Sequence, residues 1–134
     1  MTTKHYTPLK GFLSLAQARA LGTCLAGEEG DYFETMLTDL AERIRTMPKT
    51  YEQDGKSDQA IVSLHYFKGG ADWYITEKDV DTDGEGQLQA FGLADLFGDG
   101  GELGYISIAE LVENNVELDL YWTPKPLAEI KKGA

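Results

Sequence analysis

Apolar and polar residues alternate most clearly over residues 60–76, where two β-prone runs flank a Lys-Gly-Gly-Ala turn. Val62, Leu64 and Tyr66 form one side of the first run, and the glycines tolerate the positive φ angles of a tight turn. The other side of this run is also apolar in part. We therefore expect a hairpin of central strands, with one face on helices and the other face partly covered.

Two helices are predicted before the hairpin. The pair Ser14 and Gln17 matches a capping box, which predicts a short helix over residues 15–25. Asp31 can cap a second helix that runs to residue 47 and ends before Pro48. Its apolar residues recur at the spacing of a core-facing stripe, namely Phe33, Met36, Leu37, Leu40 and Ile44. This helix should therefore lie across one face of the sheet.

Three extended segments follow the hairpin. Residues 88–93 and 102–106 predict a third and a fourth strand, and residues 116–122 predict an edge strand or an extended arm. A second capping box, Ser107 with Glu110, predicts a short helix between the last two segments. The resulting fold class is α+β, with a mainly antiparallel sheet of about four or five strands in sequence order and the N-terminal helices on one face.

The length of 134 residues and the hydrophobic content of 42% suit a single domain. It divides into a lead-in over residues 1–11, a helical part over 14–47, a sheet part over 60–122 and a short tail over 124–134. The lead-in lacks periodicity and is expected to be extended or loosely held. The chain has no apolar run of about 20 residues and no charged start followed by an apolar core. We therefore expect a cytoplasmic protein without a membrane partner.

Negative charge is concentrated in one part of the chain. The net charge is −11, and residues 71–119 carry thirteen acidic residues against Lys78 alone, whereas residues 1–70 are nearly neutral. Binding to phosphates needs clustered Lys and Arg, so nucleic acid is not expected as a direct ligand. A basic protein is the favoured partner. The residues expected to bind it are Asp72, Glu77, Asp79, Asp81, Asp83, Glu85, Asp99, Glu102, Glu117, Asp119, Tyr121 and Trp122.

Tyr121 and Trp122 are included because they are consecutive in an extended segment. Consecutive strand residues face opposite ways, so we expect one of the two rings to remain exposed among acidic residues. An exposed aromatic ring surrounded by carboxylates suits a protein interface. The other aromatic residues are expected to form the sheet core and its rims.

A calcium site is only half matched. Asp79, Asp81 and Asp83, followed by Gly84, have the spacing of the first half of an EF-hand loop. The twelfth position, where a bidentate Glu is required, is Ala90. We therefore expect a solvated loop and predict no specific metal and no cofactor.

Catalysis is also weakly indicated. A metal-dependent hydrolase or nuclease would recruit Asp72, Glu77 and Lys78, but adjacent residues of a strand point to opposite faces. His65 on a strand and Cys24 on an apolar helix face are expected to be structural. The sequence holds no nucleophile elbow, P-loop or dinucleotide fingerprint. A non-enzymatic protein is therefore favoured.

Three motifs between residues 60 and 130 are similar to a known family. They are Trp73-Tyr74-Ile75-Thr76-Glu77, Leu103-Gly104-Tyr105-Ile106-Ser107 with Glu110-Leu111, and Asp119-Leu120-Tyr121-Trp122-Thr123-Pro124. This stretch resembles small proteins of plasmids, phages and integrative elements that are catalogued as a domain of unknown function. The resemblance implies a mobile-element context and no established catalytic residues.

Charge and context together give one functional hypothesis. The protein would inhibit a host nucleic-acid-binding defence protein, such as a restriction or CRISPR effector, by presenting a negatively charged surface. Two alternatives stay open at this point. One is a small metal-dependent enzyme or nuclease, and the other is an accessory protein that self-associates through its sheet edge.

Overall fold

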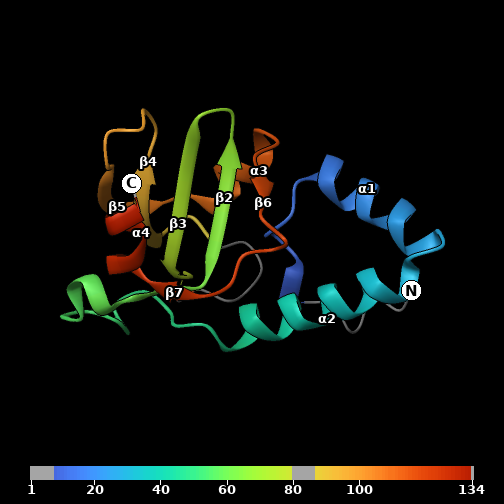
Figure 1. Ribbon diagram of the computed structural model, residues 1–134, viewed down its shortest axis with the longest axis horizontal. Helices are drawn as coiled ribbons and strands as arrows, with labels where there is room; N and C mark the ends of the chain where they lie inside the picture. The colour runs from blue at the N-terminus through green and yellow to red at the C-terminus, as the bar shows by residue number, and fades with distance from the viewer. Residues whose placement is uncertain (1–7, 80–86, 134) are drawn as a thin grey trace.

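The computed structural model describes residues 8–79 and 87–133. Its centre is a five-stranded antiparallel sheet in the order β5-β4-β3-β2-β6. Figure 1 shows this sheet on one side of the molecule, with α1 and α2 extending to the other. The strands are β2 (Leu64–Lys68), β3 (Ala71–Glu77), β4 (Ala90–Asp95), β5 (Glu102–Ile106) and β6 (Glu117–Leu118).

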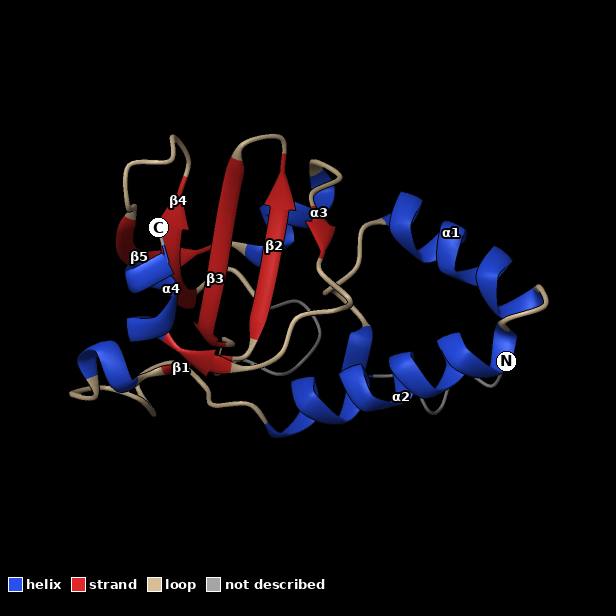
Figure 2. Ribbon diagram, viewed as in Figure 1, coloured by secondary structure: helices blue, strands red, loops and turns tan. Residues whose placement is uncertain are grey.

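Four α-helices and a small second sheet complete the described fold (Figure 2). The helices are α1 (Leu15–Ala26), α2 (Gly30–Thr46), α3 (Ile108–Glu113) and α4 (Leu127–Gly133), and a short 3-10 helix, η2, spans Ser57–Gln59. The second sheet pairs β1 (Ile61–Val62) with β7 (Lys125–Pro126). The predicted α+β class, with N-terminal helices and an antiparallel sheet, is confirmed. None of the helices in the described residues is long and apolar enough to cross a membrane.

Three details of the sheet differ from the prediction. Strands β2 to β5 follow sequence order, but β6 returns to pair with β2, because α3 leads the chain back across the sheet. The first run of the predicted hairpin is split, since Ile61–Val62 pairs with β7 and not with β3. The predicted edge strand over residues 116–122 pairs only at Glu117–Leu118 before the chain turns.

The outer side of β6 is covered by a side chain in place of another strand. Ser14 caps α1 as predicted, because its hydroxyl accepts a hydrogen bond from the Gln17 N–H at 3.1 Å. The side-chain amide of Gln17 does not reach back to the cap. It donates to the Leu118 carbonyl at 2.8 Å and accepts from the Leu118 N–H at 2.9 Å. One glutamine side chain thereby satisfies two backbone groups of β6 that would otherwise be unpaired at the edge of the sheet.

Helix α2 begins one residue before the predicted cap. Glu29 occupies the N-cap position without a side-chain hydrogen bond, and Asp31 lies in the first turn, where it complements the helix dipole. Leu37, Leu40 and Ile44 of the predicted stripe are buried. Phe33, which was also predicted to be buried, is only partly so, because it lies near the helix start, away from the sheet.

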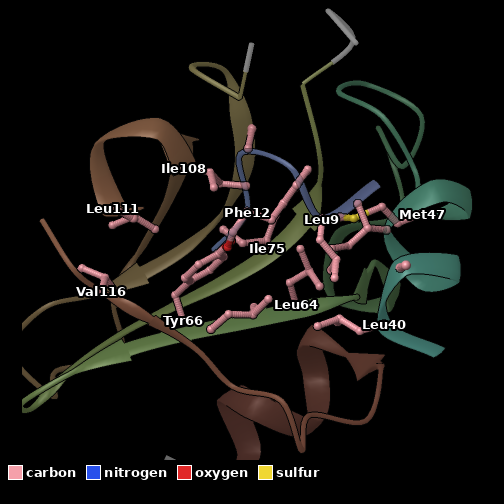
Figure 3. Close-up of a cluster of buried hydrophobic side chains, with 14 of the residues drawn as sticks. Leu9, Phe12, Leu40, Met47, Leu64, Tyr66, Ile75, Ile108, Leu111 and Val116 are labelled. Atoms are coloured by element: carbon pink, nitrogen blue, oxygen red, sulfur yellow. The ribbon is translucent and has the colours of Figure 1, made fainter. Parts of the chain in front are cut away.

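The main core lies between the sheet and the N-terminal segment, as Figure 3 shows. The end of the predicted lead-in belongs to this core, since Leu9 and Phe12 are 6% and 3% exposed. The Tyr66 hydroxyl donates to the Phe12 carbonyl at 2.5 Å. The prediction of a loose lead-in is therefore wrong for Leu9, and residues 1–7 lie outside the described part. On the other face, α4 contributes to a smaller cluster of Ala60, Val62, Leu93 and Leu127.

Buried polar side chains anchor the loop between α2 and β1. The amide of Gln53 donates to the carbonyls of Ile61 at 3.0 Å and Thr76 at 2.8 Å, and its oxygen accepts from the Ile61 N–H at 2.7 Å. The Thr50 hydroxyl lies 3.0 Å from the Lys78 carbonyl. By sequence, residues 49–59 are polar and rich in turn-forming residues, which predicts a simple connecting loop. Its buried hydrogen bonds instead fix the loop against the ends of β1 and β3.

Candidate protein-binding surface

Strand register places four side chains in one row across the sheet. Glu117 pairs with Phe67, Phe67 with Asp72, and Asp72 with Asp95. Directly paired residues project on the same face, so three carboxylates and one ring lie side by side. Like charges directly opposite each other destabilise an antiparallel pair. Burial, and then the carboxylates of Asp72 and Asp95, raise the pKa of the neighbouring Tyr74.

The turn after β4 adds exposed apolar groups to these carboxylates. The Asp95 carboxylate accepts hydrogen bonds from the N–H groups of Gly98 at 2.8 Å and Asp99 at 3.2 Å, which holds the turn. Leu96 and Phe97 project from it and are 47% and 85% exposed. Among the large apolar side chains of the described residues, Phe97 has the highest exposed fraction. Adjacent exposed apolar groups with a polar rim are typical of interaction sites.

These features share one end of the sheet, which we call the acidic end. Figure 1 shows the β2–β3 turn, the β4–β5 turn and the α3–β6 connection together at the top of the molecule. The acidic residues of this end are Asp72, Asp95, Asp99, Glu102, Glu110, Glu113 and Glu117. Lys68, at the end of β2, donates to the Asn114 carbonyl at 2.7 Å and not to a carboxylate. The fold therefore brings these seven acidic residues to one end of the sheet.

His65 holds two of the predicted partner-binding carboxylates. Its Nε2 lies 2.8 Å from Asp72 Oδ1, and its Nδ1 lies 3.0 Å from Asp119 Oδ2. A neutral imidazole has one N–H, so only the imidazolium donates to both carboxylates. The ring stacks on Tyr74 at 4.9 Å between centroids and packs beside Trp122 at 5.0 Å. Both ring nitrogens of His65 therefore have carboxylate partners in this arrangement.

Two predicted partner-binding residues lie inside the protein. Glu77 is 5% exposed and accepts hydrogen bonds from the Tyr51 N–H at 2.7 Å and the Thr76 hydroxyl at 2.9 Å. Asp79 is 6% exposed, and its carboxylate accepts from the Gln89 N–H at 3.1 Å. The prediction of a surface role does not hold for these two residues. A register shift between Ile75 and Glu77 alters the pairing there, which alternation alone does not foresee.

Three further predicted residues, Asp81, Asp83 and Glu85, lie outside the described residues. The half-matched calcium loop therefore stays a prediction. Within the two described ranges, no group of three or more His, Cys, Asp or Glu residues is placed to hold a metal ion.

Tyr121 lies away from the acidic end, whereas Trp122 lines a pocket with Asp95 and packs beside His65. Tyr121 is 69% exposed, and the nearby hydroxyl of Tyr32 on α2 raises its pKa. The Trp122 indole donates to the Val62 carbonyl at 3.0 Å, and Lys125 lies 4.6 Å from its ring centroid. One of the two rings, that of Tyr121, is exposed, as predicted, and its surroundings include Tyr32 and the carboxylate of Glu29.

Sequence reasoning missed Phe97 because residues 94–97 fitted both a strand end and a helical turn. The signal in the sequence was the Gly-Asp-Gly-Gly run that follows, because an aromatic residue next to such a turn lies in a surface loop and not in the sheet.

Lys78, a candidate for metal-assisted hydrolysis, has a different role. Its ammonium donates to the Ile44 carbonyl at 2.6 Å and the Arg45 carbonyl at 3.2 Å, at the C-terminal end of α2. Burial lowers the pKa of Lys78.

Cys24 is partly exposed, although a buried thiol was predicted. In α1 only Leu21 is buried, because the helix contacts α2 and projects from the sheet. The thiol therefore lies on a helix with a narrow packed side. Within the described residues it makes no hydrogen bond to a histidine, and His65 is engaged by Asp72 and Asp119.

Comparison with known proteins identifies a family. Residues 34–125 match the family described as "Protein of unknown function (DUF2958)". The match covers more than half of the chain, so this protein belongs to that family. It begins within α2 and ends in β7, and so includes the whole acidic end. No curated protein and no solved structure matches the chain.

Proposed function

We propose that this protein is a non-enzymatic binding protein whose acidic end docks on a basic surface of another protein. The observation that carries the proposal is the exposed Phe97 beside the row of Glu117, Asp72 and Asp95. Like charges in directly paired positions weaken a sheet. The placement of the directly paired Asp72 and Asp95 next to an uncovered ring is best explained by a partner that needs both.

The two kinds of group have separate tasks in this proposal. The carboxylates raise the rate of encounter with a basic partner and orient it, because long-range charge acts mainly on association. Phe97 and Leu96 enter an apolar recess of the partner and slow dissociation, as buried aromatic anchors do. Charge alone would give a weak, easily screened complex, so the apolar anchor supplies the lifetime.

The partner class that we propose is a nucleic-acid-binding protein. A groove that binds phosphates is lined by Lys and Arg, and a surface of closely spaced carboxylates complements such a groove. A host defence protein in the cytoplasm, such as a restriction or CRISPR effector, is the specific form of this hypothesis. The resemblance to mobile-element proteins motivates it. Occupation of the groove would then inhibit the partner.

A matched pair of triple variants tests the proposal. The test variant carries Asp99→Asn, Glu102→Gln and Glu117→Gln at the acidic end. The control variant carries Glu28→Gln, Glu29→Gln and Glu34→Gln, which remove the same charge near the α1–α2 turn. Each protein is immobilised and exposed to a lysate of the source organism at low and high salt. Captured proteins are identified by mass spectrometry.

The wild type and the control variant should capture the same nucleic-acid-binding protein, which high salt and added duplex DNA release. Screening over about 10 Å at 0.1 M ionic strength explains the salt effect, and competition for one groove explains the DNA effect. The free protein should not bind the DNA itself. Equal capture by the test variant, or capture that DNA does not disturb, would exclude the proposed mode of binding.

A further inference from the structure

A groove opens at the acidic end between the sheet and α3. Its volume is about 450 Å³, which is enough for a large side chain of a partner. Trp73, Leu96 and Ile106 line it from the sheet side, and Leu111 lines it from α3. Leu96, in the turn after β4, joins the groove to the acidic end, although Trp73 and Ala94 of its lining project to the sheet face opposite Asp72 and Asp95. A partner that reaches around this end of the sheet therefore contacts both.

Two polar groups of the groove have no partner within the described residues. The backbone N–H of Glu110 bonds to the Ser107 cap, but the Glu110 carboxylate makes no hydrogen bond or ion pair there. The indole N–H of Trp73 is likewise unused by the described residues. Lys68, the basic residue of the lining, is held by the Asn114 carbonyl at 2.7 Å. The groove therefore combines an available anion, an aromatic ring and apolar walls.

We propose that this groove receives an arginine side chain of the basic partner. A guanidinium is planar, so it can bond to the Glu110 carboxylate through two N–H groups while stacking on the Trp73 ring. Its methylene groups would cover Leu96 and Ile106. A lysine ammonium has the same charge but neither the fork nor the flat face. This inference rests on the proposed function, and it adds the side chain that the acidic end selects.

Nuclear magnetic resonance of the full chain tests the groove directly. The probes are two short glycine-rich peptides of equal length and charge, one with arginine and one with lysine. The chain has two tryptophans, and Trp122→Phe assigns the indole N–H signal of Trp73. The arginine peptide should move this signal in a saturable manner. The lysine peptide should bind at least about threefold more weakly, because it lacks the bidentate contact.

Glu110→Gln and Glu113→Gln form the matched control pair. Both residues are exposed on α3 and the net charge changes equally, but only Glu110 lines the groove. Glu110→Gln should weaken arginine-peptide binding by about tenfold, and Glu113→Gln by about twofold or less. A stationary Trp73 signal, or equal losses in the two variants, would overturn the groove assignment. Salt-sensitive shifts of backbone signals at Glu102 and Glu117 would then still support the acidic end, and their absence would count against both proposals.

Discussion

The two ends of β3 use the same kind of side chain for opposite purposes. Asp72 lies at the acidic end, where its side chain is 35% exposed and faces the carboxylate of Asp95 across the sheet. Glu77 lies at the other end and is 5% exposed, with N–H and O–H donors on both carboxylate oxygens. Both side chains are carboxylates on the same strand. The difference lies in exposure and in the number of partners, because Asp72 is bonded, among the described residues, to His65 alone, through one oxygen, whereas both oxygens of Glu77 accept hydrogen bonds.

The two ends of β3 therefore differ in role, since one stabilises the fold and the other has polar groups available for a partner. At the Glu77 end, Gln53 and Thr50 also spend their hydrogen-bonding groups on backbone atoms, so little remains for a partner. At the acidic end, the carboxylates of Glu102 and Glu117 make no such contacts within the described residues. Polar groups satisfied internally stabilise the fold, whereas exposed and unmatched ones are available for binding.

The largest loss of stability is expected for a substitution in the apolar core, and it gives a scale for the effects at the two ends of β3. Leu40 is 2% exposed on the α2 stripe, so Leu40→Ala should lower the free energy of unfolding by about 2–5 kcal/mol through lost burial and a cavity. Leu15→Ala is the matched control, because Leu15 is 64% exposed on α1, and it should cost about 0.5 kcal/mol or less. Urea unfolding measures both. Equal losses would contradict the assignment of the stripe to the core.

The Glu77 end should be nearly as sensitive, although its groups are polar. Gln53→Ala removes the partners of the Ile61 N–H and of the carbonyls of Ile61 and Thr76. Each buried group left without a partner costs about 1–3 kcal/mol, less where water enters, so a total loss of about 2–4 kcal/mol is expected. Gln59→Ala, at an exposed position of the same loop, should change the free energy of unfolding little. A neutral Gln53→Ala would show that this end is solvated.

Tyr66→Phe tests how the buried tyrosine of the main core makes the stability of the protein depend on pH. Burial raises the pKa of Tyr66 well above its ordinary value of 10.0, and its hydroxyl donates to the Phe12 carbonyl. The unfolded chain therefore releases this proton at a lower pH than the folded chain does. The stabilisation is complete below pH 10.0 and is lost as the pH rises above it.

At neutral pH the variant should be less stable by about 1–2 kcal/mol, from the lost hydrogen bond. Above pH 10.0 the difference between the two proteins should shrink, because only the wild type loses the Tyr66 contribution. Thermal unfolding followed by circular dichroism across this range measures the difference. A gap that stays constant with pH would mean that Tyr66 does not set the alkaline limit.

The same contrast explains how far sequence reasoning reached. The caps at Ser14 and Ser107 and the burial of Leu37, Leu40 and Ile44 follow from local spacing, and all are present. The pairing of β6 with β2 and the Gln17 contact to Leu118 join distant segments, so no local pattern contains them. Burial of Glu77 depends on a register shift, and exposure of Phe97 depends on where a turn projects. The charge distribution along the sequence indicated the acidic region, but only the fold shows which of its carboxylates are exposed.

The smallest stability effect is expected at the acidic end itself. The triple variant Asp99→Asn, Glu102→Gln and Glu117→Gln should unfold within about 0.5 kcal/mol of the wild type, because these exposed groups contribute little to packing. A small gain is the expected sign, since the substitutions relieve repulsion among neighbouring carboxylates. Added salt should stabilise the wild type slightly more than the variant, because it screens that repulsion. Urea unfolding at two salt concentrations measures both effects. A loss as large as that of Gln53→Ala would make the acidic end a structural element like the Glu77 end, and the division of β3 into a structural and a binding end would fail.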